Sequence, residues 1–277
     1  MTSGTTGEHR GVRKKAWPAL SFVGLLLATT LLAAAFQAPA RLDVMSSGGF
    51  TAAYLELSKA FSEQTGVVLD TVYGASMGGA TSAIPSRLQR NEAADVVILA
   101  GEALALLVGS GQVVADSRVD LASSRIGMAV RHGTAIPNIR TIEAFTQTLL
   151  QTKSIAYSAS ASGTYLSTVL FPRLGIGEQI AHKSIRVVGE RVGTVVARGD
   201  ADIGFQQVSE LLPIEGITYV GPIPDETQKI TVFAAGVTTS AKDPDTAKRL
   251  IAFLSSPNAA PIITKTGMTP QLSIPSR

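Results

Sequence analysis

The 277-residue chain contains no cysteine, one tryptophan and three histidines, and aromatic side chains make up only 5% of its residues. The lack of cysteine excludes disulfides, a thiol nucleophile, Cys-ligated zinc and iron–sulfur clusters. Only His132 and His182 lie beyond the first forty residues, which is too few for a His-rich metal centre. The sequence therefore predicts no metal site and no cofactor.

An excess of charge of one sign occurs only at the start of the chain. Charged residues make up 16% of the sequence, and the net charge is +3. In residues 1–40 four basic side chains accompany a single acidic one, so the rest of the chain is electrically balanced. Nucleic-acid binding needs a basic surface and aromatic stacking platforms. We therefore expect no nucleic-acid partner.

A long apolar run also occurs only near the start. Residues 17–40 carry no charge, a basic stretch precedes them, and Ala38, Pro39 and Ala40 place small residues where a signal peptidase would cut. This three-part pattern is typical of a secretory signal peptide. Residues 33–35 offer a second cut site, and a retained membrane anchor is the alternative because about 20 apolar residues span a bilayer. We expect residues 1–40 to be a cleaved leader and the protein to be periplasmic.

Beyond the leader, β-rich and helix-like runs alternate, and apolar residues amount to 45% of the chain, enough for a sizeable core. This alternation predicts an α/β fold with largely parallel sheets flanked by helices. Pro85 must lie in the first turn of its helix or kink it. We expect strands at 42–45, 67–73, 95–100, 126–131, 154–158, 185–189, 201–206, 217–220 and 230–237. We expect helices at 50–61, 80–90, 102–108, 142–150, 160–173, 190–198, 244–255 and 257–266.

Three turns of small residues follow predicted strands, at 46–49, 74–79 and 160–164. Each would place backbone N–H groups and hydroxyls at the carboxyl end of a strand, where sheets of this type bind ligands. Helix N-termini also favour an anion. Helix capping is the simpler interpretation of any single turn. Three such turns in one chain indicate a shared anion site.

Several segments carry a family resemblance. Residues 61–66 read FSEQTG, residues 94–100 read ADVVILA, and residues 199–205 read GDADIGF. With the three small-residue turns, they resemble segments of the type II periplasmic solute-binding proteins, and most closely the molybdate-binding branch. The resemblance covers residues 42–270.

The resemblance implies two lobes joined by a two-strand hinge, with the ligand cleft between them. The first lobe would comprise residues 41–124 and 231–277, and the second residues 125–230. It further implies a monomeric periplasmic binding protein that captures a small anion and delivers it to the membrane permease of an ABC-type transporter.

The ligand-binding residues expected from these turns and from the resemblance are Ser46, Ser47, Ser76, Ser162, Thr164, Arg191 and Gln206. The chain departs from the molybdate binders around Gln206, because that branch has a tyrosine in this stretch and residues 205–207 here read FQQ. Arg191 adds a positive charge that a carboxylate would pair with, although it could also be a solvated helix residue. The departures favour a carboxylate over a tetrahedral oxyanion such as molybdate.

An enzyme on the same scaffold is the alternative function. Bacterial aconitate isomerases resemble this binding-protein family, and they move a double bond within a tricarboxylate. That chemistry needs a base close to a carbon beside a carboxylate, and donors that stabilise the developing charge. The candidate bases in this sequence are Glu190, His132, Tyr157 and Tyr165, and nothing in the sequence ranks them.

Overall fold

The computed structural model describes residue 1, residues 4–7 and residues 39–271. Most of the predicted leader, residues 8–38, lies outside the described residues. The chain divides into two units, Met1–Pro39 and Ala40–Arg277, and all elements named below belong to the second. In the part of the chain that is described, no helix is both long and apolar enough to cross a bilayer.

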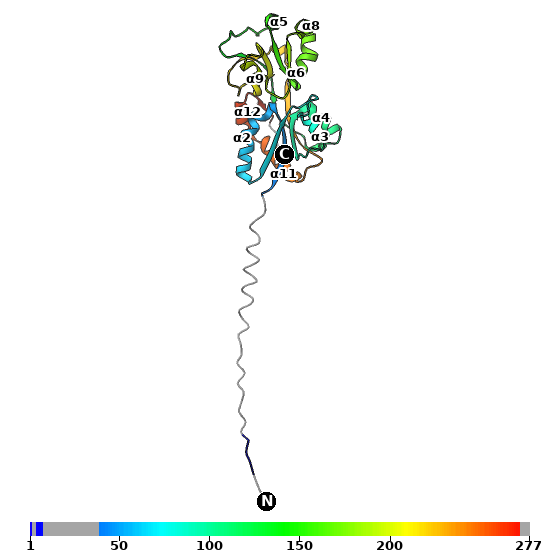
Figure 1. The fold of residues 1–277 in the computed structure, drawn as a ribbon, viewed down its shortest axis with the longest axis vertical. Helices are drawn as coiled ribbons and strands as arrows, with labels where there is room; N and C mark the ends of the chain where they lie inside the picture. The colour runs from blue at the N-terminus through cyan, green and yellow to red at the C-terminus, as the bar shows by residue number, and fades with distance from the viewer. Residues whose placement is uncertain (2–3, 8–38, 272–277) are drawn as a thin grey trace. The chain divides into compact units, whose positions relative to one another are not determined.

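Two mixed sheets form the framework of this unit (Figure 1). The first has six strands in the order β11-β4-β10-β3-β1-β2, and the second has five in the order β7-β6-β8-β5-β9. The strands of the first sheet are β1 (Arg41–Ser47), β2 (Val68–Gly74), β3 (Val96–Ala100), β4 (Val119–Ser124), β10 (Thr231–Val237) and β11 (Thr269–Pro270). Those of the second are β5 (Ile126–Arg131), β6 (Ile155–Ser158), β7 (Ser184–Val187), β8 (Ile203–Gln207) and β9 (Ile217–Pro222).

The direction of a strand relative to its neighbours depends on whether the strand follows a crossing of the chain from one sheet to the other. β1 is parallel to β2 and β3, and β6 is parallel to β7 and β8. The chain crosses from β4 to β5 through Arg125 alone, and it returns from β9 to β10. β5 and β10, the strands that follow these crossings, are antiparallel to their neighbours. Among the described strands four pairs are parallel and five, including β4 with β11, are antiparallel, so both sheets are mixed. The carboxyl ends of the parallel strands carry the loops described below.

Helices cover both sheets, one set on each (Figure 1). Those on the first sheet are α2 (Gly48–Thr65), α3 (Ile84–Gln89), α4 (Gly101–Gly109), α11 (Pro244–Leu254) and α12 (Ala260–Lys265). Those associated with the second are α5 (Ile142–Gln151), α6 (Ala161–Tyr165), α7 (Phe171–Arg173), α8 (Gly177–Ala181), α9 (Val192–Ala197) and α10 (Val208–Leu211). A short π-helical stretch, Leu166–Leu170, connects α6 to α7. The short helix α10 is unusual because it also contacts α2 of the other set.

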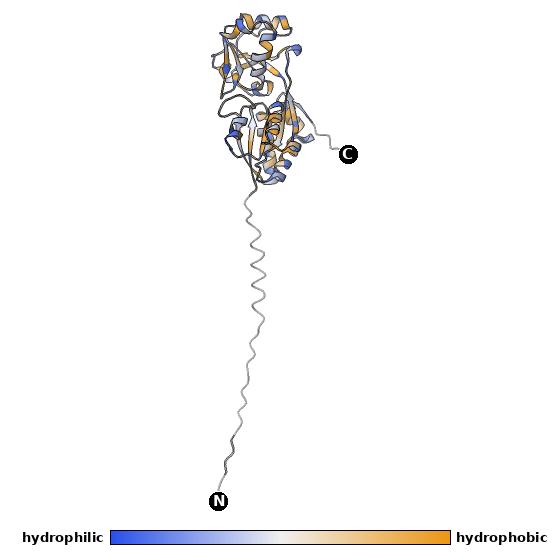
Figure 2. Ribbon diagram, turned by 90° about the vertical axis from the view of Figure 1, so that its right-hand side faces the viewer, coloured by the Kyte–Doolittle hydropathy of each residue, from blue (hydrophilic) through white to orange (hydrophobic). Residues whose placement is uncertain are grey.

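Each sheet has its own apolar core. Tyr54 and Phe50 of α2 pack on the first sheet, while Phe145 of α5 meets Phe205 of β8 edge-to-face on the second, with ring centroids 5.9 Å apart. Apolar residues are concentrated on the strands and on the helix faces against them (Figure 2). Burying several such side chains, at about 1.5–3 kcal/mol each, is what holds each layer together.

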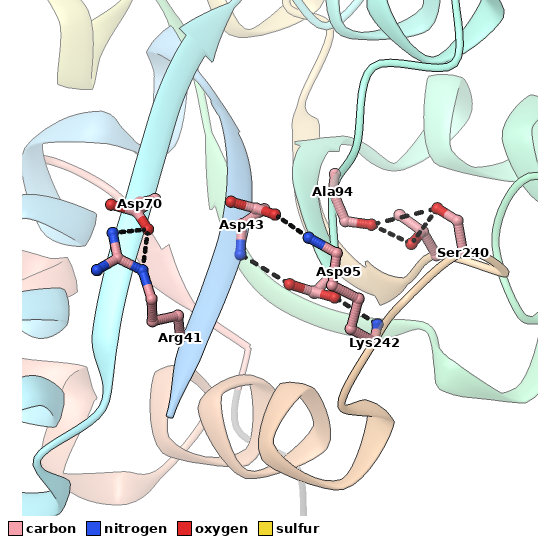
Figure 3. A network of polar contacts seen from close by, with 8 residues as sticks. Arg41, Asp43, Asp70, Ala94, Asp95, Ser240 and Lys242 are labelled. Carbon is pink, nitrogen blue, oxygen red and sulfur yellow. Dashed lines mark hydrogen bonds and ion pairs between the residues drawn. The ribbon is translucent and has the colours of Figure 1, made fainter. Parts of the chain in front are cut away.

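A buried carboxylate fixes the centre of the first sheet (Figure 3). Asp95, immediately before β3, is 2% exposed. Its two oxygens accept hydrogen bonds from the backbone N–H groups of Asp43 and Lys242, both at 2.7 Å. The ammonium group of Lys242 in turn lies 3.1 Å from the Asp43 carboxylate. Asp95 thus joins β1, β3 and the segment that leads into α11.

Candidate functional site

A cavity of about 470 Å³ lies between the two sheets. It is lined by the segments that follow β1, β2, β6, β7 and β8, so it collects the carboxyl ends of strands from both sheets, as ligand sites in open α/β sheets do. Its volume is within the usual range for a small-molecule site. The two sides also contact each other directly, because the hydroxyl of Ser209 donates a hydrogen bond to the carbonyl of Gly49 at 2.6 Å.

Four of the residues predicted to bind the ligand line this cavity: Ser76, Ser162, Arg191 and Gln206. Ser76 is buried, and its Oγ accepts a hydrogen bond from the backbone N–H of Ala100 at 2.9 Å, which leaves its own O–H available to donate. The hydroxyl of Ser162 lies 3.1 Å from that of Ser158. The turns after β2 and β6 therefore meet in one site.

Ser46 and Ser47 are not among the lining residues, but they come directly before Gly48 and Gly49, which are. Both serines are essentially inaccessible, and among the described residues neither hydroxyl has a hydrogen-bond partner. Leaving a buried polar group unpaired costs about 1–3 kcal/mol. The end of β1 therefore holds polar groups that the protein itself does not satisfy.

Thr164 lies elsewhere. Its backbone N–H donates to the carbonyl of Ser160 at 2.9 Å, inside the first turn of α6, and its side chain is exposed. It does not line the cavity. The structure thus separates Thr164 from the other predicted ligand residues, since the turn at 160–164 presents its earlier residues to the cavity and its last one to solvent.

Arg191 is the N-cap residue of α9 and is partly buried in the cavity wall. Its guanidinium has no carboxylate partner within 4.0 Å in the part of the chain that the structure describes. It acts electrostatically on two other lining groups, Tyr73 and Glu210. Burial raises the pKa of the Tyr73 hydroxyl, and the charge of Arg191 opposes that rise. An uncommitted guanidinium facing a cavity can pair with a carboxylate by two parallel hydrogen bonds.

Glu210, on α10, is a lining residue that the sequence analysis missed. Burial raises the pKa of its carboxyl group to about 7, while Arg191 and hydrogen bonds from Gln206 and Gln207 act to lower it. The side-chain amide of Gln206 donates to Glu210 Oε1 at 2.8 Å. A carboxyl group with a pKa close to neutral, in a cavity, is typical of proton-transfer sites.

The four bases considered from the sequence are less well placed. Glu190 does line the cavity, but Arg198 donates to both of its carboxylate oxygens, at 2.6 and 2.9 Å, and this pairing lowers its pKa. His132 is exposed at the end of β5, and neither it nor Tyr157 or Tyr165 lines the cavity. The Tyr165 hydroxyl instead donates to the carbonyl of Thr227 at 3.0 Å.

A signal for Glu210 was present in the sequence. Gln206 and Gln207 stand where the resemblance expects a different pattern, and Glu210 follows them within one helical turn at the carboxyl end of a predicted strand. That position places a side chain at the ligand edge of a sheet. The four-residue α10 is too short to show helical periodicity, so the sequence did not reveal which way Glu210 would point.

Comparison with known proteins assigns the family. The model for bacterial extracellular solute-binding proteins matches residues 42–269. The chain belongs to this family. Among solved structures, members of the same fold include the periplasmic molybdate-binding protein of Azotobacter vinelandii, with a TM-score of 0.66, 20% identity, and coverage of 85% of this chain and 100% of that one. The sulfate-binding protein of Mycobacterium tuberculosis H37Rv gives a TM-score of 0.63 at 19% identity, covering 83% and 87%. The resemblance and the type II fold predicted from the sequence are confirmed.

A much closer relative is an enzyme. The chain is 47% identical over 253 residues to an aconitate isomerase from a Pseudomonas species, which covers 91% of this chain and 96% of that protein. This finding contradicts the leading expectation from the sequence, a binding protein that supplies an anion to a transporter. That expectation was wrong because the Ser/Gly turns that suggested it are scaffold features, which receptor and enzyme share.

Proposed function

We propose that this protein is an aconitate isomerase, which interconverts cis- and trans-aconitate on a solute-binding scaffold. The observation that carries the proposal is the 47% identity to an aconitate isomerase over nearly the whole of both chains. The cavity supports it, because it offers both anion-binding groups and a titratable carboxyl group.

The reaction is a proton shift across three carbons. A base removes a proton from the methylene carbon, which lies beside a carboxylate, and the C–H electron pair spreads over the neighbouring double bond and the carboxylate. A proton then bonds to the carbon that was vinylic, and the double bond forms on the other side of the central carbon. No atom is gained or lost. The site must bind three carboxylates, stabilise the delocalised charge and carry one proton.

The residues of the cavity divide these tasks. Arg191 pairs with one carboxylate of the substrate, and the hydroxyls of Ser76 and Ser162 donate to others. The first N–H groups of the 18-residue helix α2, at Gly48 and Gly49, complete the anion site at the end of β1. The unpaired hydroxyls of Ser46 and Ser47 lie directly before them in the chain and are buried. Gln206 orients the carboxyl group of Glu210 through a hydrogen bond. Thr164 remains at the exposed rim.

The two sheets act as two lobes, residues 41–124 with 231–277 and residues 125–230, which close over the substrate. We place the protein outside the cytoplasm, after export by the leader in residues 1–40, in keeping with an extracellular family. The reaction begins and ends with a free tricarboxylate, so it requires no membrane permease as partner.

Turnover tests this proposal directly. Purified protein is incubated with trans-aconitate in heavy water, and the isomers are followed by proton NMR beside a sample without protein. We expect cis-aconitate to form in the protein sample alone, with deuterium at the carbon that receives the proton only to the extent that the carried proton exchanges with the solvent. Absence of conversion from either isomer would overturn the proposal.

A further inference from the structure

We infer that Glu210 carries the proton in this reaction, taking it from the methylene carbon of aconitate and returning it to the former vinylic carbon. The inference rests on the proposed function, and it names a group that the sequence did not single out. One carboxyl group suffices for both steps, because the two carbons are separated by a single atom and lie on the same small substrate.

The position of Glu210 supports this role. It lies on α10, where the second sheet's strand β8 ends, yet α10 packs against α2 of the first sheet. The carboxylate approaches the start of α2 so closely that a Cβ added to Gly48 would collide with Glu210 Oε1. The absence of a side chain at position 48 therefore leaves room for the Glu210 carboxylate beside the anion-binding turn.

Gln206 holds that carboxylate in one orientation. Its Oε1 accepts a hydrogen bond from the backbone N–H of Val192 at 2.9 Å, so its amide nitrogen must face the other way. That nitrogen donates to Glu210 Oε1 at 2.8 Å. Because a backbone N–H can only donate, the amide cannot flip without losing its bond to Val192. Gln206 is thus a positioning residue that fixes the orientation of the Glu210 carboxylate through Oε1, and the backbone of Gln207 supplies a further hydrogen bond to the same group.

The charged and titratable groups around Glu210 match the needs of a base. Arg191, at the start of α9, is the cation that faces it, and Tyr73 of β2 is the other titratable group linked to Arg191. Glu190 is held by Arg198, and Gly48 and Gly49 contribute no ionisable side chain. Burial raises the pKa of Glu210 to about 7, so near neutral pH it exists in both the form that accepts a proton and the form that donates one.

The test compares Glu210→Gln with wild-type protein. The amide keeps the size of the side chain and cannot take up the proton, so we expect conversion of aconitate to fall at least about 100-fold, the usual contribution of a general base. Glu215→Gln is the control, because Glu215 is exposed, lies outside the cavity and is on the same segment of chain. Binding of tricarballylate, the saturated analogue, is followed by thermal shift in all three proteins.

The outcomes separate the two proposals. Loss of conversion in Glu210→Gln, with tricarballylate binding kept and Glu215→Gln fully active, supports the inference. Active wild-type protein with an equally active Glu210→Gln variant overturns the role of Glu210 and leaves the function intact. Inactive wild-type protein overturns both.

A second measurement needs no variant. If Glu210 must be ionised to take the first proton, kcat/KM of the wild-type protein rises with pH through a single ionisation close to 7. Should Glu210→Gln fail to fold, this profile decides, and a flat profile between about pH 5.5 and 8.5 would overturn the inference.

Discussion

At the scale of single residues, the cavity holds a cation, Arg191, close to a weakly acidic carboxyl group, that of Glu210. Arg191 favours the ionised form of Glu210, while burial favours the protonated form, and burial is the larger effect. A receptor for a tricarboxylate has use for the cation alone, since a carboxylate in the site repels its ligand. The proposed function uses both groups, Arg191 to bind a substrate carboxylate and Glu210 to carry the proton.

Arg191→Ala should weaken the binding of tricarballylate by about 1.5–3 kcal/mol, the range for hydrogen bonds to charged groups. The affinity of Arg191→Lys for tricarballylate should lie between those of the wild-type protein and Arg191→Ala, because lysine keeps the positive charge and lacks the planar guanidinium. Arg140→Ala, at an exposed position away from the cavity, is the control. Calorimetric titration measures all four proteins, and unchanged affinity in Arg191→Ala would remove this residue from the ligand site.

At the scale of secondary-structure elements, the sequence predicted those with a long or strongly apolar pattern. The strand expected at 95–100 is β3, and the helix expected at 50–61 is α2, which begins two residues earlier and ends four residues later. Pro85 lies in the first turn of α3, as its ring requires. In each case the signal was local, either an apolar run of strand length or apolar residues at helical spacing.

Two of the elements that the sequence did not predict, β4 and α10, depend on contacts with distant parts of the chain. Strand β4 alternates poorly, and its backbone pairs with β10 and β11, which come more than a hundred residues later in the chain. Helix α10 has four residues and is held by contacts with α2. Because Glu210 lies on α10, the sequence could place it near the ligand edge of the sheet but could not show which way its side chain points.

Asp95 offers a test of how one element is fixed to the next. Asp95→Asn replaces one of its two acceptor oxygens by a donor, so either the Asp43 or the Lys242 backbone N–H loses its partner. We expect the free energy of unfolding to fall by about 1–3 kcal/mol. Asp70→Asn, on strand β2 of the same sheet, removes the exposed ion pair with Arg41 and should cost less than about 1 kcal/mol. Urea unfolding compares them, and equal losses would contradict the importance of the buried carboxylate.

At the scale of the whole molecule, ligand selectivity follows from a cavity shared by two sheets. We expect tricarballylate and both aconitate isomers to raise the melting temperature, because a ligand at 100 times its dissociation constant adds about 2.7 kcal/mol to the stability of the folded state. Molybdate, tungstate, sulfate and phosphate should leave it unchanged. A thermal-shift comparison of the two sets measures this, and a response to the tetrahedral oxyanions alone would contradict the assignment of Arg191 to a carboxylate.

The location of Glu210 inside an anion site has a consequence for the heat of binding. A bound tricarboxylate brings further negative charge close to a carboxyl group whose pKa is already about 7, and this raises that pKa again. Near neutral pH the complex must then take up a fraction of a proton from the buffer. The measured enthalpy will differ between buffers of different ionisation enthalpy, and the midpoint of the kcat profile will lie above that of kcat/KM. A change of affinity with pH will therefore report the proton taken up on binding as well as the contacts between protein and ligand.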